Sequence, residues 1–301
     1  MNINNIIRMM AVALLMTGAM ACKAQKDGGG SIDADAQSVA LPAFDAIHND
    51  CAVRLHIAQG NRQSVWVKHA PDWRIEVSVS DRTLRLKEEQ SFGQLNKCAE
   101  VWITVPALKS IGNNGALYVD GNNIKGKELS VTNNGALTLS GDNLNIGILN
   151  YNNKGSITEN LRADCKEVHI DNLGSFKTQL TLAGNDIFTL NNRGSYGGDI
   201  EIAGKTINIE NGGAMNGDMA IHAATLTFNN NGSGTQKISF FGDEMNIDNN
   251  GSVNVDLQVD CKKLHAESSG VSTLVISGTA DDTRIKSGGI SNIDSSKLNR
   301  F

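Results

Sequence analysis

The sequence predicts an all-β protein, a single-stranded parallel β-helix (solenoid) of about ten coils of 19–20 residues, preceded by irregular N-terminal coils. Three observations lead to this fold class. A glycine recurs at a nearly fixed interval, apolar residues alternate with polar ones around it, and no proline follows Pro106. Proline cannot donate a hydrogen bond to a neighbouring strand, so its absence suits strands that are paired along their whole length.

The recurring glycine sets the period of the repeat. It stands at Gly115, Gly135, Gly155, Gly174, Gly194, Gly213, Gly232, Gly251, Gly270 and Gly289. Apolar residues lie four and six positions before most of these glycines, with polar residues between them, as in a strand with one buried face. A second alternating stretch follows each glycine. Each repeat should therefore form two strands and two turns, and stacking the repeats buries a continuous core.

An asparagine stands two positions before the glycine in the first eight repeats. These residues are Asn113, Asn133, Asn153, Asn172, Asn192, Asn211, Asn230 and Asn249. They share the parity of the inward-facing apolar residues, so we expect a buried ladder in which each amide bonds the amides above and below it. We expect the glycine to adopt a positive φ at a tight turn, which larger residues resist.

The N-terminus indicates export. An apolar stretch at 9–20 follows a single positive charge and is too short to span a bilayer, as in a signal peptide. Ala19–Cys22 resembles a lipoprotein cleavage site, in which Cys22 becomes the lipidated first residue. Ordinary cleavage after Ala21 or Ala24 is the alternative. We therefore expect a signal peptide at 1–24, a flexible tether at 25–40, irregular coils at 41–112 and regular repeats at 113–301.

The net charge of the chain and its predicted export restrict the classes of partner and the cellular location that we expect. The chain has 27 Lys and Arg against 32 Asp and Glu and no basic block, which argues against nucleic acid as a partner. A lipid on Cys22 would attach the protein to a membrane. We expect it in the cell envelope, at the outer membrane or cell surface of a Gram-negative bacterium, or in the periplasm if it is not lipidated.

The remaining cysteines and the histidines predict no metal site and no cofactor. Cys165 and Cys261 occupy the same slot of the repeat five coils apart, roughly 24 Å at the spacing of strands. A disulfide needs Cα atoms within about 7 Å, so both should be free thiols. Cys51 and Cys98 lie together in the irregular region, where a disulfide between them would suit an exported protein. The histidines form no recognised metal-binding spacing.

We expect no catalytic residues in the repeats, because their constant period leaves no room for the long loops that form a catalytic groove. The alternative is a carbohydrate-active enzyme with its site in residues 44–112. There, three tryptophans could stack on sugars and four acids could act on them: Trp66, Trp73 and Trp102, with Asp72, Glu76, Glu88 and Glu89. Trp66 and Trp102 lie in alternating strands, which favours packing in the core instead.

Four segments of the N-terminal third carry a family resemblance. They are FDAI (Phe44–Ile47), AVRLHIAQGNRQSVWV (Ala52–Val67), TLRLK (Thr83–Lys87) and VWITVPALKSI (Val101–Ile111). With the small-residue turns that follow, residues 44–301 resemble the family of putative autotransporter-adhesin head GIN domains. The resemblance implies a right-handed β-helix, export and adhesion, with no catalytic residue.

The expected function is therefore that of a non-catalytic rod in the envelope, an adhesin or surface interaction module. Its partner would be a glycan, or a protein of the envelope or of a host surface. The last coil has no evident cap, so its exposed edge could also pair with a second copy of the chain.

Overall fold

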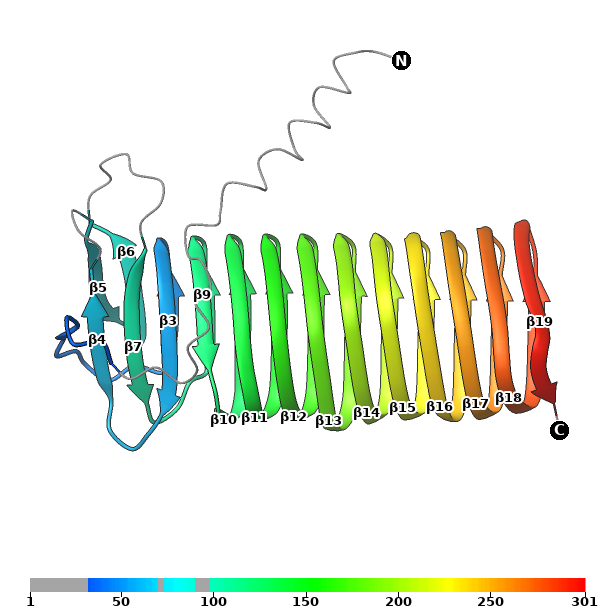
Figure 1. Ribbon diagram of the computed structural model, residues 1–301, viewed down its shortest axis with the longest axis horizontal. Coiled ribbons are helices and arrows are strands. Elements are labelled where there is room, and N and C mark those ends of the chain that lie inside the picture. The colour runs from blue at the N-terminus through cyan, green and yellow to red at the C-terminus, as the bar shows by residue number, and fades with distance from the viewer. Residues whose placement is uncertain (1–31, 70–72, 90–97, 301) are drawn as a thin grey trace, which may run out of the picture.

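The computed structural model describes residues 32–69, 73–89 and 98–300, which form one elongated rod of stacked coils (Figure 1). The expected signal peptide, Cys22 and the first part of the tether lie outside the described residues. Within those residues the structure contains strands and turns but no α-helix, and hence no helix able to cross a membrane. The predicted all-β solenoid is confirmed.

The regular part of the rod is a stack of parallel strands in register. Leu190, for example, pairs with Ile209, and Ile209 with Phe228. Every stacked position therefore lies on the same face in each coil, which keeps one side of every strand buried. The strands are β10 (Lys125–Asn133), β11 (Ala136–Asn153), β12 (Ser156–Asn172), β13 (Ser175–Asn192), β14 (Ser195–Asn211), β15 (Ala214–Asn230), β16 (Ser233–Asn249), β17 (Ser252–Ser268), β18 (Val271–Ser287) and β19 (Ile290–Arg300).

Each full coil is one continuous bent strand, where the sequence predicted two strands and two turns. β12 to β18 each run for 17 or 18 residues. The chain bends at the expected second turn with only a local slip in pairing, as between Leu182 and Asn185 of β13. Because strand pairing continues through this bend, only the turn at the recurring glycine interrupts each of these coils.

The N-terminal end is built in a different order from the chain. Its strands are β1 (Gln37–Ser38), β2 (Ala46–Asn49), β3 (Ala52–Gln59), β4 (Ser64–Lys68), β5 (Ile75–Ser80), β6 (Thr83–Glu88), β7 (Ala99–Val105), β8 (Ser110–Asn113) and β9 (Ala116–Gly121). Along one side of the rod they pair as β1–β4–β7–β3–β9–β11, and along the other as β5–β6–β2–β8–β10. The segment from β4 to β7 thus folds back over the start of the rod.

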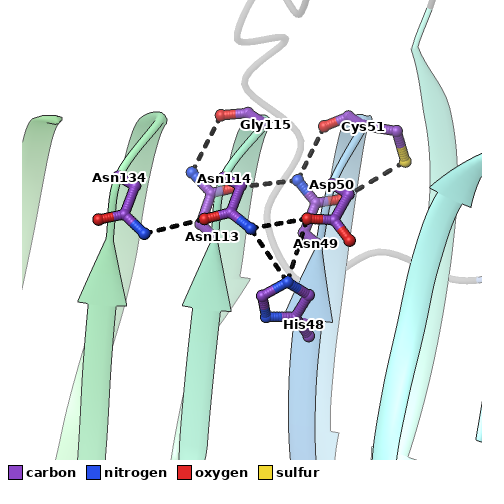
Figure 2. Close-up of polar contacts among 8 residues, drawn as sticks. All are labelled: His48, Asn49, Asp50, Cys51, Asn113, Asn114, Gly115 and Asn134. Carbon is purple, nitrogen blue, oxygen red and sulfur yellow. Dashed lines mark hydrogen bonds and ion pairs between the residues drawn. The ribbon is translucent and has the colours of Figure 1, made fainter.

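The asparagine ladder is confirmed from Asn113 to Asn230, and it begins one coil earlier than predicted, at Asn49 (Figure 2). Each side-chain Nδ2 donates to the Oδ1 of the next asparagine over 2.7–2.9 Å. Asn249 occupies the same column, but its side-chain oxygen and nitrogen have no partner among the described residues. The ladder satisfies polar atoms that would otherwise be costly to bury.

The glycine of the turn is needed for close packing and not for its φ, which corrects the sequence-based expectation. Of the ten recurring glycines only Gly289 has a positive φ, of 64°. At Gly135 a Cβ would overlap the carbonyl oxygen of Gly115 in the coil below, and the same overlap recurs up the stack. That carbonyl accepts a hydrogen bond from the N–H of Ala136 at 2.9 Å. Successive turns therefore approach too closely for any side chain.

The predicted disulfide between Cys51 and Cys98 is not formed, because Cys51 is a buried free thiol. Val53 of β3 pairs with Ala99 of β7, and both face the core. Cys51 shares the inward parity of Val53, whereas Cys98, one residue before Ala99, has the outward parity. The two cysteines thus belong to opposite faces of the sheet. Cys165 and Cys261 are free thiols as predicted, and burial raises the pKa of each to about 11.

One inward-facing column becomes polar in the middle of the rod. It runs through Leu139, Glu159, Thr178, Gly198, Gly217, Gln236 and Val255. Glu159 is buried and accepts a hydrogen bond from Thr178 Oγ1 at 2.7 Å. Burial raises the pKa of Glu159 to about 7 even though the hydrogen bond from Thr178 acts to lower it. This carboxyl group is enclosed in the core and has no route to a substrate.

Candidate functional site

A long hollow lies on the outer face of the rod, over the part of each coil that follows the recurring glycine. We call it the outer groove. Its main part, of about 510 Å³, is lined from coils β12 to β16, and an adjoining part of about 390 Å³ continues to β18. The two parts share Asp218 and Lys237. The groove therefore runs along the rod across several coils, as a site for an extended ligand would.

The backbone beneath the groove departs from a regular strand. Gly198 and Gly217 have φ values of 120° and 142°, which favour glycine over other residues. They immediately precede the groove residues Asp199 and Asp218. They also remove two successive side chains from the inward column, so the regular pleat is disturbed where the groove lies.

The groove is lined by polar and charged side chains that point away from the core. Its main part carries three acids and two bases along with neutral amides and hydroxyls: Asp199, Glu201, Asp218, Arg162, Lys237, Asn160, Gln179, Thr181 and Ser239. Among the described residues, the ion pairs do not include Asp199, Glu201, Asp218 or Lys237. These groups can therefore donate and accept hydrogen bonds to a bound molecule.

The groove has no large hydrophobic side chain that projects into solvent, although the edges of core residues such as Leu180, Ile200 and Met219 form part of its floor. The large hydrophobic side chains exposed in the described part of the chain are Ile32, Leu173, Ile187, Phe241, Val271 and Ile290. None of them lines either part of the groove. Protein interfaces usually have an apolar centre rich in aromatic residues. The groove combines polar rims with an apolar floor and has no exposed aromatic centre, which suits a ligand with both hydroxyl groups and apolar C–H faces.

A second polar cluster, at the N-terminal end, is an extension of the turn structure. Asn114 Nδ2 donates to Asp50 Oδ1 at 2.7 Å and contacts His48 Nε2 at 3.1 Å, and Asn134 Nδ2 donates to Asn114 Oδ1 at 2.9 Å (Figure 2). Burial acts to raise the pKa of Asp50, but the Asn114 hydrogen bond and the nearby His48 outweigh it and lower the pKa. These side chains bond to one another along the stack, so the cluster acts as a short outer ladder beside the buried one.

The residues of the alternative enzyme site are not brought together. Trp73 packs in the core, and its Nε1 donates to Glu88 Oε1 at 2.8 Å. Asp72 lies outside the described residues. Glu76 and Glu89 are exposed, and neither lines the cavity beside Trp66 and Trp102. Within the described part of the chain, no group of three or more His, Cys, Asp or Glu side chains is arranged to hold a metal ion.

Trp66 and Trp102 face outward, which corrects the expectation that they pack in the core. Val65 and Val67 on one strand, and Val101 and Ile103 on the other, are the inward residues. The tryptophans between them have the opposite parity. This signal was present in the sequence, because valine and isoleucine flank each tryptophan on both sides.

A known family matches most of the chain. Residues 43–181 and 238–300 match the family model described as "Putative auto-transporter adhesin, head GIN domain". The chain belongs to this family. An adhesin-type family implies an exported, surface-associated bacterial protein. No curated protein matches the chain.

Solved structures of low sequence identity resemble the GIN-domain chain along most of its length. One is titled a putative adhesin from Parabacteroides merdae, with 14% identity, a TM-score of 0.45, and coverage of 86% of this chain and 94% of that chain. Another is titled a putative adhesin from Parabacteroides distasonis, with 14% identity, a TM-score of 0.44, and coverage of 86% and 95%. A third, from the same species, is titled a putative lipid binding protein, with 13% identity, a TM-score of 0.42, and coverage of 86% and 95%.

Proposed function

We propose that this GIN-domain protein is a non-catalytic adhesin of the bacterial envelope that binds an extended glycan along the outer groove. The observation that carries the proposal is the groove itself, which crosses the coils from β12 to β18 and is lined by amides, hydroxyls and charged groups of both signs. A chain of sugars offers hydroxyl groups at regular intervals, and stacked coils offer hydrogen-bonding groups at intervals of about 4.8 Å.

The position of the protein in the cell forms part of the same proposal. A lipid on Cys22 would anchor the chain to the outer membrane, with the segment up to β1 acting as a tether. The rod would then project away from the membrane with the groove in its distal part. Ordinary cleavage of the signal peptide would instead release the protein into the periplasm.

The proposal is tested by binding of the mature protein to an array of neutral and acidic polysaccharides, with envelope and matrix proteins on the same array. We expect saturable binding to a polysaccharide. The double variant Asp199→Ala/Asp218→Ala should weaken binding about tenfold or more, because it removes two carboxylates from adjacent coils of the groove. The matched control, Asp171→Ala/Glu210→Ala, removes two exposed acids that lie outside the groove lining and should bind normally.

Each other outcome rejects a part of the proposal. Binding to proteins alone would replace the glycan with a protein partner. Cleavage of a bound polysaccharide, followed by analysis of its reducing ends, would revive the enzyme alternative. Equal binding by the groove variant and its control would move the binding site elsewhere on the rod.

A further inference from the structure

A row of aromatic side chains crosses the outer face at the N-terminal end of the rod. Trp66 of β4 lies opposite Trp102 of β7, Trp102 opposite His56 of β3, and His56 opposite Asp120 of β9. These four residues come from strands that are distant in sequence and meet only because β4 and β7 fold back over the first coil. The His56 and Trp102 rings are stacked, with centroids 5.3 Å apart and planes 16° apart.

The row forms one wall of a cavity of about 270 Å³, which we call the aromatic slot. Small side chains of the neighbouring row, Ala58, Ser64 and Thr104, leave room beside the rings. Ile32, from the segment before β1, lines the slot as well. Trp102 has only 7% of its surface exposed although it faces away from the core, so the slot is a recess and not a flat patch.

The segment that carries Ile32 is fixed over this face of the sheet. Lys68 Nζ lies 2.6 Å from Asp33 Oδ2, and Ser38 of β1 pairs with Trp66. The slot therefore has an aromatic wall on the sheet and an apolar contact from the N-terminal segment. The recess therefore lies between two parts of the chain.

Two buried polar atoms at the slot have no partner. Trp102 Nε1 and His56 Nδ1 are both buried and make no hydrogen bond to any residue that the structure describes. Buried polar atoms are almost always bonded in folded proteins, and exceptions call for an explanation. A ligand with hydroxyl groups would supply acceptors for the indole N–H and for the imidazole. Burial lowers the pKa of His56, which keeps this ring neutral and able either to donate or to accept.

We propose that the aromatic slot binds a single neutral sugar ring of a glycan. A sugar ring has apolar C–H faces that pack on aromatic rings, and hydroxyl groups at its edge that need hydrogen-bond partners. The slot offers both, because Asp120 and Asn122 line it together with the rings. Its volume suits one ring and not a polymer. The carboxylate of Asp120 disfavours anionic sugars by like-charge repulsion.

The slot is separate from the outer groove, although both proposals name a carbohydrate. It lies on β3, β4, β7 and β9, whereas the groove lies on β12 to β18. The slot can thus be tested with short sugars that are too small to span the groove. Failure in this test leaves the groove proposal standing, and failure of polysaccharide binding leaves the slot proposal standing.

The test is a titration of the mature protein with neutral hexoses and N-acetylhexosamines, as monosaccharides to trisaccharides, followed by tryptophan fluorescence. Trp66 and Trp102 lie at the slot and Trp73 in the core, so binding should produce a saturable change in emission. Trp66→Ala should weaken binding about tenfold, the loss expected when a stacking ring is removed. Asp120→Asn keeps the shape of the slot and should also weaken binding, by removing a charged acceptor.

Two controls separate recognition from misfolding. Trp66→Phe keeps a ring and should retain more affinity than Trp66→Ala. Glu210→Gln changes an exposed acid outside both the slot and the groove and should leave the binding of short sugars unchanged. The proposal is overturned if no sugar changes the emission, if only aromatic peptides or acidic sugars bind, or if Trp66→Ala and Asp120→Asn both bind like the wild type.

Discussion

Two neighbouring glycines in one turn show how closely the coils approach. A Cβ on Gly213 would overlap the carbonyl oxygen of Gly194, whereas a Cβ on Gly212 would meet its nearest neighbour at 3.9 Å. We expect Gly213→Ala to lower the free energy of unfolding by about 1–3 kcal/mol, the usual cost of overpacking. Gly212→Ala should be close to neutral. Urea unfolding of both variants checks this, and equal effects would refute the packing explanation.

The buried carboxyl group of Glu159 makes stability depend on pH. Its pKa is raised from 4.5 to about 7, so between these values the folded protein keeps a proton that the unfolded chain has released. The stabilisation that the protonated Glu159 gives the folded state is therefore complete below pH 4.5 and is lost as the pH rises towards 7. The free energy of unfolding falls by about 3 kcal/mol over this range. Glu159→Gln cannot ionise and should lack this loss.

Urea midpoints at several pH values for the wild type and Glu159→Gln measure the effect directly. The difference between the two proteins removes the contribution of all the other titrating groups. A difference that is constant from pH 4.5 to pH 8 would show that Glu159 does not hold its proton in the folded state.

At the scale of the element, the asparagine ladder joins each coil to the next. Asn172 accepts from Asn153 at 2.8 Å and donates to Asn192 at 2.7 Å and to the Ser195 carbonyl at 2.9 Å. Asn172→Ala should lower the free energy of unfolding by about 2–4 kcal/mol, because it leaves buried hydrogen-bonding partners unsatisfied. Asn249→Ala is the matched control and should cost less, since Asn249 is buried in the same column without side-chain partners. Hydrogen exchange should show faster opening of β12 and β13 in Asn172→Ala, and equal costs for both variants would contradict a ladder role.

The sequence predicts the regular coils well, because their contacts repeat at a fixed interval. The glycine period gives the register of β10 to β18, and the parity of the asparagines gives the ladder. The role of the glycine was not predictable in this way, since overlap with the previous turn depends on the distance between coils. The early start of the ladder was hidden because Cys51 stands in the first coil where later coils have glycine.

The irregular end was much harder to predict, because its strands pair out of sequence order. Nothing local shows that β2 pairs with both β6 and β8, or that β4 folds back against β7. The disulfide expected between Cys51 and Cys98 failed because the pairing of β3 with β7 puts the two residues on opposite faces of the sheet. The outward direction of Trp66 could have been derived from the valines beside it, but the slot could not, since it needs four strands and the segment at Ile32.

At the scale of the whole molecule, the two ends of the rod differ. The first end is built of short antiparallel strands, β4 against β7 and β5 against β6, whereas the other ends in the parallel strand β19, which among the described strands pairs with β18 alone (Figure 1). Ile290 on β19 is 80% exposed. An open strand edge with an apolar side chain is a template for pairing, and a second copy of the same edge is its simplest partner.

We therefore expect the protein to dimerise through its C-terminal coils at high concentration. Ile290→Lys should weaken the dimer about tenfold, by removing an apolar contact and placing like charges together. Leu173→Lys changes a comparably placed turn residue in the middle of the rod, 47% exposed, and should have no effect. Sedimentation velocity over a range of concentrations measures the association, and a monomer throughout would reject the contact.

The direction of the strand pairing also determines how the rod would carry tension. The hydrogen bonds between coils lie along the rod axis, so a pull along that axis loads them one coil after another instead of all at once. A ligand held in the outer groove and an anchor at the N-terminus would place the first half of the rod under this load. Each coil that peels away would release roughly 65 Å of extended chain. The part of the rod between anchor and ligand would therefore unfold coil by coil under the pull of flowing liquid, while the coils beyond the ligand stayed folded.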